Sequence, residues 1–371
     1  MKHSASYTLS LVIPCFNEAR TIEACVNRVL EFSREHSVSI EIIVVDDAST
    51  DGSWQILQNI SGKYSGIKIF KHEKNRGKGA ALQTGFLHAA GDFVGIQDAD
   101  TEYDPADYIS MLEPMLDGRA DVVYGSRYLR PDTRRVLYYW HTCMNKTLTA
   151  VSNSFTDLDI TDMETCYKLF RREVIQKIAP QLKEKRFGFE PEITARIADM
   201  GCRVYECGIS YNPRSYEEGK KVNWKDGIRA LYCVFHYSAH SAPLPMQILI
   251  YLFIGGISML ANMTFFMIFN YLSFSVNYSV IGAFILSAAV NYILCILILF
   301  RHKARWKTLT ELLLYGLTVV IMGFIDFGMT KALIALSGGQ LILSKLIASV
   351  TGFAGNFLLR KWLVFSEKKK K

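Results

Sequence analysis

Four long apolar stretches in the last third of this 371-residue chain place the strongest limit on its fold. They lie at about 246–270, 278–300, 309–336 and 341–365. Each is near or above the ~20 residues that a helix needs to cross the hydrocarbon layer. We therefore expect an all-α domain of four transmembrane helices after a separate domain outside the lipid. The predicted domains are 1–236, which ends in an interfacial segment, and 237–371.

The positive charge of the chain is concentrated in this membrane domain. Residues 246–371 contain 12 Lys and Arg against 3 acidic residues, whereas residues 1–245 contain 30 against 32. A nucleic-acid-binding protein needs a basic face on its soluble part, so nucleic acid is not an expected partner. The segment 301–307 and the tail 368–371 are basic, and they follow the second and fourth stretches. By the positive-inside rule, we expect a multi-pass protein of the inner (cytoplasmic) membrane, with domain 1–236 and the C-terminus in the cytosol.

Cysteine spacing and the N-terminus agree with that location. The eight cysteines form no C-x-x-C pair, so neither a disulfide framework nor a zinc site is expected. Residues 1–10 lack the apolar run of a signal peptide.

The apolar stretches also have the pattern of an internal repeat. Polar and aromatic residues recur at an offset of 64 or 65 in the pairs Tyr251 and Tyr315, Asn262 and Asp326, Asn291 and Asn356, and Phe300 and Phe365. Polar groups inside spans are expected to face inward, which favours a two-helix repeat. Chance matching among apolar residues is the alternative, because such repeats are weak in sequence.

The first domain has the pattern of a nucleotide-binding α/β fold. Short aliphatic runs lie at Leu9–Ile13, Ile40–Val45, Phe93–Ile96 and Asp121–Tyr124. Apolar residues recur at helical spacing between the first two runs, in Thr21–Glu35. This alternation predicts a doubly wound sheet, with ligands at the carboxyl ends of the strands.

Acidic residues follow several of these predicted strands. The segments are Pro14 to Glu18, Asp46 to Gly52, and Gln97 to Asp100. Carboxylates gathered at one sheet edge repel each other and are tolerated mainly when they share a cation. Asp98-Ala99-Asp100 is the strongest candidate for Mg²⁺ or Mn²⁺, which would keep positions open for diphosphate oxygens. A solvated turn is the alternative for an isolated triplet, but this one follows a predicted buried strand.

A glycine-rich basic segment, Asn75–Gly79, precedes a predicted helix over Ala80–Ala90. Backbone N–H groups at a helix start and a nearby lysine can bind an anion. An exposed basic turn is the alternative interpretation.

Taken together, five motifs in order resemble the GT-A fold family 2 glycosyltransferases, and among them the dolichyl or undecaprenyl phosphate sugar synthases. They are Val12–Glu18, Asp46–Gly52, Asn75–Gly79, Asp98–Asp100 and Gly125–Arg127. The segment Asn356–Phe365 resembles the end of the GtrA-like transmembrane domain. The fusion is similar to membrane-embedded dolichol-phosphate mannose synthases and GtrB-type enzymes. The implied architecture is a GT-A (Rossmann-like) nucleotide-sugar-binding domain followed by a four-helix transmembrane domain.

This resemblance implies a role for particular residues. Nucleotide binding is implied for Pro14, Phe16, Asn17, Glu18, Val45, Asp46, Asp47 and Lys78. Metal binding is implied for Asp98, Asp100 and Glu102, the last at a position where the family often has Gln. Contact with the lipid phosphate or diphosphate is implied for Arg127, Arg130, Lys168, Arg214, Lys220 and Lys221. Asp100 and Arg127 are the expected catalytic residues.

The implied reaction is an inverting transfer of a hexose from a nucleotide sugar to polyprenyl phosphate, with Mg²⁺ or Mn²⁺ as cofactor. The donor is left open between GDP-mannose and UDP-glucose, and the sequence does not decide whether the chain forms a homo-oligomer. The rival hypothesis is a non-catalytic translocase or scaffold for the lipid-linked sugar. Both D-x-D carboxylates and the basic segments favour the enzyme.

Overall fold

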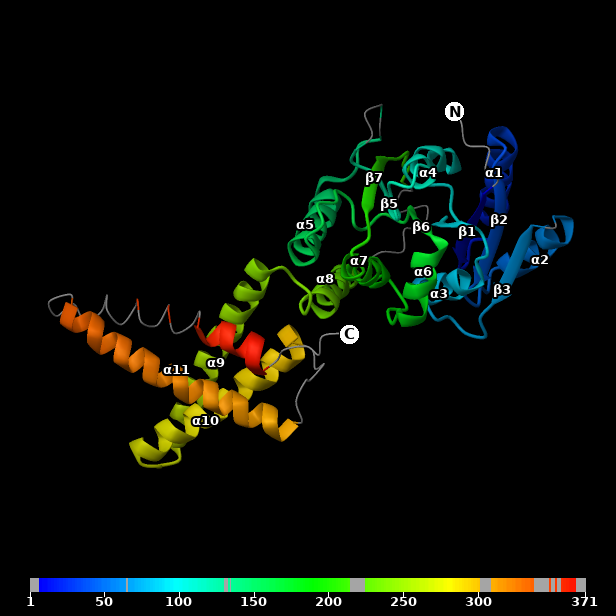
Figure 1. The fold of residues 1–371 in the computed structure, drawn as a ribbon. Coiled ribbons are helices and arrows are strands. Elements are labelled where there is room, and N and C mark those ends of the chain that lie inside the picture. Colours follow the sequence, from blue (N-terminus) through cyan, green and yellow to red (C-terminus); the bar gives the residue numbers. More distant parts are fainter. Residues whose placement is uncertain are drawn as a thin grey trace. The chain divides into compact units, whose positions relative to one another are not determined.

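A computed structural model of the chain forms two compact units, residues 1–241 and 242–371. It describes residues 7–64, 66–129, 133, 135–213, 224–300, 308–336, 347, 351 and 355–364. Figure 1 shows the sheet in the first unit and long helices in the second.

The first unit is built on a seven-stranded sheet in the described residues, with strand order β3-β2-β1-β4-β6-β5-β7. The strands are β1 (Thr8–Cys15), β2 (Ser39–Asp46), β3 (Ile67–Lys71), β4 (Phe93–Ile96), β5 (Val122–Ser126), β6 (Lys168–Arg171) and β7 (Val204–Gly208). Strands β3, β2, β1 and β4 are mutually parallel, as are β5 and β7. The predicted aliphatic runs all form strands of this sheet.

Strand β6 departs from the expected parallel arrangement. It lies between β4 and β5 and runs antiparallel to both. The predicted α/β sheet is therefore confirmed, but it is mixed, because β6 is antiparallel to its two neighbours. The reason is the long connection from β5 through α5 (Tyr139–Thr156) and residues 157–167, which brings the chain into the sheet from the opposite end.

Helices cover both faces of the sheet, because side chains of a strand alternate between its faces. Leu11 and Ile13 of β1 pack with Val26 and Val29 of α1 (Ile22–His36) in the main core. Val12 faces the other way, against α3 (Lys78–His88). The remaining helices of this unit are α2 (Ser53–Lys63), the 3₁₀ turn η1 (Pro105–Asp107), α4 (Tyr108–Leu116), α6 (Arg172–Ile178), the 3₁₀ turn η2 (Ala179–Gln181), α7 (Phe189–Asp199) and α8 (Trp224–Ser238).

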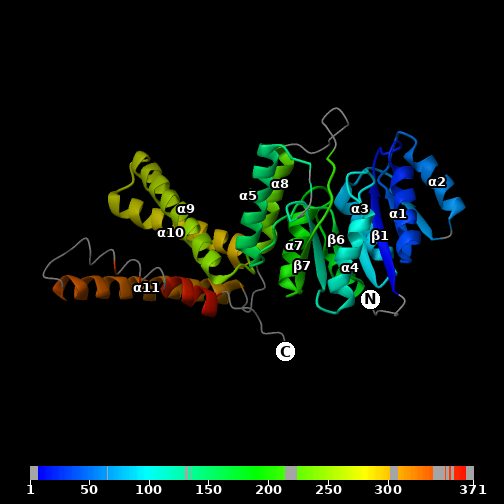
Figure 2. The same ribbon diagram turned by 90° about the horizontal axis from the view of Figure 1, so that it is seen from above.

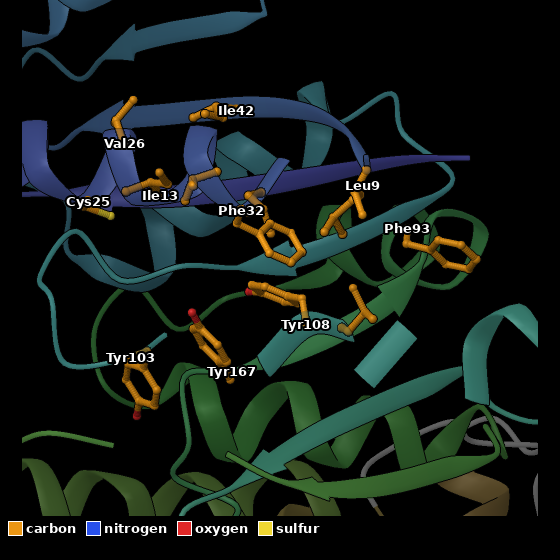
Figure 3. Packing of buried hydrophobic residues seen from close by; sticks show 14 of the residues in the cluster. Leu9, Ile13, Cys25, Val26, Phe32, Ile42, Phe93, Tyr103, Tyr108 and Tyr167 are labelled. Carbon is orange, nitrogen blue, oxygen red and sulfur yellow. The ribbon is translucent and has the colours of Figure 1, made fainter. Parts of the chain in front are cut away.

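A stack of tyrosines supports the end of β4 (Figure 3). The Tyr167 ring lies between those of Tyr103 and Tyr108, with centroid distances of 4.7 and 4.8 Å. The Tyr108 hydroxyl donates to the carbonyl of Ile96 at 2.7 Å, and the Tyr167 hydroxyl donates to Oε1 of Gln97 at 2.5 Å. The stack therefore holds in place the end of β4 and Gln97, directly before Asp98.

Helices α5 and α8 lie side by side (Figure 2), and the rings of Phe155 and Phe235 meet at 4.8 Å. Helix α8 lies at the end of the first unit, where the interfacial segment is predicted, and its exposed apolar side chains include Ile228, Leu231 and Phe235.

The second unit contains α9 (Leu244–Tyr271), α10 (Val276–Leu294), the π-helical turn η3 (Cys295–Phe300), α11 (Thr308–Leu336) and the π-helical turn η4 (Arg360–Val364). Helices α9 and α10 pack side by side (Figure 2). Among the described residues, α9 is the helix that is long and apolar enough to cross a membrane, and shorter apolar segments lie at Ile285–Leu299 and Leu313–Met322. Most of the fourth predicted span, 341–365, lies outside the described residues.

Candidate functional site

The loops after β1 and β2 are tied together by hydrogen bonds. Asn17, at a left-handed φ of 54°, accepts at Oδ1 from the backbone N–H of Thr50 at 2.8 Å. The N–H groups of Asn17 and Glu18 donate to the hydroxyls of Ser49 and Ser53, both at 2.9 Å. The predicted nucleotide-binding segments Pro14 to Glu18 and Val45 to Asp47 therefore form one structured edge.

Asp46 and Asp47 lie side by side but have different partners. Asp47 accepts from the N–H groups of Arg76 and Gly77 at 2.9 and 2.6 Å, so it anchors the basic segment before α3. His72 also contacts Asp47, with 2.6 Å between Nδ1 and Oδ1. Asp46 accepts from Ser49 N–H through Oδ2 at 3.2 Å, whereas its Oδ1 is buried without a hydrogen-bond partner. A buried acceptor without a partner is costly, and a donor on a ligand would satisfy it.

Lys78 lies at the first position of α3 and reaches the D-x-D segment after β4. Its ammonium lies 2.7 Å from Oδ1 of Asp98 and 2.7 Å from Sγ of Cys166. Burial lowers the pKa of Lys78, but Asp98 and Cys166 raise it more, so the pKa lies well above its ordinary value. Lys78 is therefore a permanent cation next to the candidate metal-binding carboxylate.

The three predicted metal ligands have separate surroundings. Asp100 is buried and accepts from the N–H of Glu102 at 3.1 Å, while Glu102 accepts from the Tyr211 hydroxyl at 2.9 Å. Within the described part of the chain, no three acidic, His or Cys side chains are arranged to hold a metal ion. Mg²⁺ is commonly held by one or two carboxylates together with phosphate oxygens, and Asp98 and Asp100 remain the candidate carboxylates for this role.

Arg127 follows β5 and forms a buried pair with Asp162. Its Nε and Nη2 donate to the two oxygens of Asp162, each at 2.7 Å, and its backbone N–H donates to Oδ2 at 3.1 Å. The guanidinium also lies 5.2 Å from the centre of the Tyr211 ring. Burial lowers the pKa of Arg127, but Asp162 raises it by more, so the pKa lies well above its ordinary value.

Lys168 is fully buried, unlike a residue that binds an external phosphate. Its ammonium donates to the carbonyl of Met163 at 3.0 Å and to that of Thr165, and it lies 5.0 Å from the Tyr124 ring centre. Burial lowers its pKa. Lys168 is buried because it lies on β6, an interior strand of the sheet. We therefore assign Lys168 to the interior of the domain and not to the acceptor site.

The other predicted phosphate contacts, Arg130, Arg214, Lys220 and Lys221, lie outside the described residues.

Sequence reasoning assigned no role to three buried or half-buried carboxylates near this edge. Asp162 holds Arg127, and both Glu164 and Glu190 have a buried oxygen without a hydrogen-bond partner. The alternate acids Asp162 and Glu164, two residues apart before a strand, were the signal available in the sequence.

The fold and the site define a class of protein. A mixed sheet with acidic loops at the carboxyl ends of β1, β2 and β4 is the GT-A glycosyltransferase fold. The chain carries a domain of the glycosyl transferase family 2, matched over residues 10–179, followed by a GtrA/DPMS transmembrane domain, matched over residues 250–365. It is thus a family 2 glycosyltransferase with a membrane domain.

Two curated relatives and one solved structure are similar to it. Dolichol-phosphate mannosyltransferase of Pyrococcus furiosus is 23% identical over 96% of this chain and 99% of its own length. Dolichyl-phosphate beta-glucosyltransferase ALG5A of Trichomonas vaginalis is 29% identical over 56% of this chain and 67% of its own. Glucosyl-3-phosphoglycerate synthase of Mycobacterium tuberculosis, solved with Mn²⁺, UDP and phosphoglyceric acid, is 17% identical, covers 62% of this chain and 78% of that one, and has a TM-score of 0.46.

Proposed function

We propose that this protein transfers a hexose from a nucleotide sugar to the phosphate of a polyprenyl lipid, as the names of its relatives indicate for them. The observation that carries the proposal is the relative that matches both domains together over 96% of this chain. The buried free oxygen of Asp46 and the pair of Lys78 with Asp98 support a nucleotide diphosphate at the same edge.

In this mechanism, an oxygen of the lipid phosphate attacks the anomeric carbon of the donor. The new carbon–oxygen bond forms as the bond to the nucleoside diphosphate breaks, so one displacement inverts the configuration. A phosphate monoester has a second pKa of about 6 and is largely dianionic at neutral pH, so no residue needs to remove a proton. An α-linked donor therefore gives a β-linked lipid product.

The residues of this chain would bind and orient the two substrates and neutralise the charge of the departing diphosphate. Asp46 would accept a hydrogen bond from the nucleoside, and Lys78 would stabilise the negative charge that develops on the departing diphosphate. A divalent cation, Mg²⁺ or Mn²⁺, held by Asp98 and Asp100 would supply further charge neutralisation. Arg127 remains the proposed contact of the acceptor phosphate. To bind it, the guanidinium would give up one of its hydrogen bonds to Asp162 and donate to a phosphate oxygen instead.

We further propose that the protein is multi-pass, with the catalytic domain on the cytosolic side of the membrane. The basic segment 301–307 and the basic tail support this orientation. Such an anchor brings the catalytic domain to the leaflet surface where a polyprenyl phosphate exposes its charged head.

The test is a transfer assay with the purified full-length protein in nanodiscs, long-chain polyprenyl phosphate, and radiolabelled GDP-mannose or UDP-glucose. We expect label in the lipid phase with one donor, dependence on Mg²⁺ or Mn²⁺, and a β linkage by NMR. Asp98→Asn should reduce the transfer by at least about a hundredfold, and the surface substitution Asp117→Asn should retain it. Binding of the lipid without transfer from any nucleotide sugar would reject the enzyme in favour of a translocase or scaffold.

A further inference from the structure

The membrane domain contains a buried cation outside the catalytic domain. Arg360, the first residue of η4, is 5% exposed. Its guanidinium carbon lies 4.4 Å from the ring centre of Tyr315 and 5.7 Å from that of Tyr251. Nη1 donates a hydrogen bond to Oδ1 of Asn291, which also accepts from the Tyr315 hydroxyl at 3.1 Å. Three segments far apart in sequence therefore converge on one arginine.

The two tyrosines of this cluster belong to the predicted internal repeat. Tyr251 and Tyr315 occupy equivalent repeat positions 64 residues apart, and the structure places both rings against Arg360. Cys295 lies 65 residues before Arg360, at the repeat-related position, and is fully buried. The arginine therefore lies where the first half of the predicted repeat has a neutral cysteine.

The hydrogen bonding of this cluster is incomplete. Nε of Arg360 is buried without a hydrogen-bond partner, and so is Oδ1 of Asn356, one helical turn earlier. Every described side chain that contacts the guanidinium is neutral. A buried cation in a membrane domain is costly unless an anion balances it. The Nε–H group of Arg360, which has no partner, suits an oxygen of a phosphate.

The depth of the cluster identifies the kind of molecule that can supply this phosphate. Tyr251 and Tyr315 lie seven residues into α9 and α11, and Asn291 lies near the end of α10. At 1.5 Å per residue, the cluster is roughly 10 Å inside the start of these helices. This end of the bundle is also where the basic segment 301–307 connects η3 to α11. A lipid headgroup reaches this depth while its chain remains in the hydrocarbon.

We propose that Arg360, with Asn291 and Tyr315, forms a second lipid-phosphate site within the membrane domain, and that its ligand is polyprenyl phosphate or its glycosylated product. The choice of a polyprenyl lipid over an ordinary phospholipid rests on the proposed function. The phosphate site itself rests on the buried arginine. Such a site would retain the lipid beside the enzyme before or after transfer.

The test is native mass spectrometry of the full-length protein with three separate lipids: polyprenyl phosphate, the matching polyprenol, and phosphatidylglycerol. We expect the wild-type protein to retain a second polyprenyl phosphate, and Arg360→Gln to lose it with a drop in affinity of roughly 10–100-fold. The matched control is Lys361→Gln, which removes the neighbouring, more exposed cation and should retain both lipids. Polyprenol should not bind at this site.

A second variant keeps the test decisive if Arg360→Gln does not fold. Asn291→Asp places a carboxylate directly on the guanidinium, so it should expel the second lipid without loss of thermal stability. Unchanged lipid stoichiometry in Asn291→Asp, or equal affinity in Arg360→Gln, would overturn the site. Retention of phosphatidylglycerol that depends on Arg360 would overturn the polyprenyl assignment.

Transfer to a short, water-soluble acceptor phosphate separates this proposal from the proposed function. We expect this activity to be unchanged in Arg360→Gln, because the short acceptor does not use the membrane domain. Activity of the wild-type protein on this acceptor with an unchanged lipid count in both variants would reject the second site alone. Absence of transfer by the wild-type protein, with an Arg360-dependent second lipid, would reject the enzyme and not the site.

Discussion

The ammonium of Lys78 lies 2.7 Å from Oδ1 of Asp98, so a cation from the start of α3 faces a carboxylate from the end of β4. The two residues are 20 positions apart, and β1 separates β2 from β4 in the sheet. Lys78 balances the charge of Asp98 in the protein without metal. A diphosphate bound here would meet a lysine and the D-x-D carboxylates at the same place.

Lys78→Met should make the protein depend on divalent metal for stability. The substitution removes the partner of a mostly buried carboxylate, which typically costs about 3–5 kcal/mol. Added Mn²⁺ should restore part of this loss because it replaces the missing charge, so the Mn²⁺-induced rise in Tm should be larger in the variant than in the wild type. Thermal unfolding with Mn²⁺ or EDTA measures this. Equal Mn²⁺ shifts in both proteins would contradict the charge-balance role.

Asp98→Asn and Asp100→Asn should each reduce transfer by at least about a hundredfold, because each removes an oxygen with the charge that a divalent cation requires. Asp98→Asn leaves Lys78 without its carboxylate partner, whereas Asp100→Asn does not, so only the first should lower Tm. Initial rates and thermal unfolding, with Asp117→Asn as the surface control, test both claims. Full activity of either variant in EDTA would exclude the metal assignment.

Arg127→Lys and Asp162→Asn distinguish a structural pair from a phosphate ligand. Both break the two-oxygen contact of Arg127 with Asp162, so both should lower Tm. If Arg127 also binds the acceptor phosphate, Arg127→Lys should raise the KM for polyprenyl phosphate by about tenfold or more, since lysine lacks the guanidinium fork. Asp162→Asn retains the guanidinium and should change this KM much less. Identical KM values in the two variants would assign Arg127 to structure alone.

Glu164 should make the stability of the first unit fall as pH rises. Burial and the neighbouring Glu190 raise its pKa from 4.5 to about 8, against the opposing effect of Lys168 and Arg127. The folded state therefore holds this proton to a higher pH than the unfolded state, and the stabilisation that results is lost between pH 4.5 and about 8.

Glu164→Gln cannot ionise, so its Tm should decline less than that of the wild type between pH 5 and pH 8.5. At pH 8.5, the pH-dependent loss of unfolding free energy should be larger in the wild type than in Glu164→Gln by on the order of 1–2 kcal/mol. Thermal unfolding across this range, with the exposed Glu113→Gln as control, provides the measurement. Parallel pH profiles for Glu164→Gln and the wild type would show that the carboxyl is already ionised at neutral pH.

Local sequence patterns determined which segments are strands and which are apolar helices. The runs at Leu9–Ile13 and Phe93–Ile96 are buried strands because continuous aliphatic side chains suit a sheet covered on both faces. The acidic segments lie at the carboxyl ends of the strands because they follow the strands directly in the sequence. The class of fold and the D-x-D edge could therefore be predicted from short motifs.

Only the tertiary structure decided which side chains meet. The antiparallel placement of β6 buries Lys168, although its sequence context resembles a phosphate-binding motif. Asp162 engages Arg127 from 35 residues away, and Arg360 meets Asn291 from 69 residues away. Periodicity along a chain reports the burial of each residue, but the partner of a buried charge depends on strand order and helix packing, which bring distant segments together.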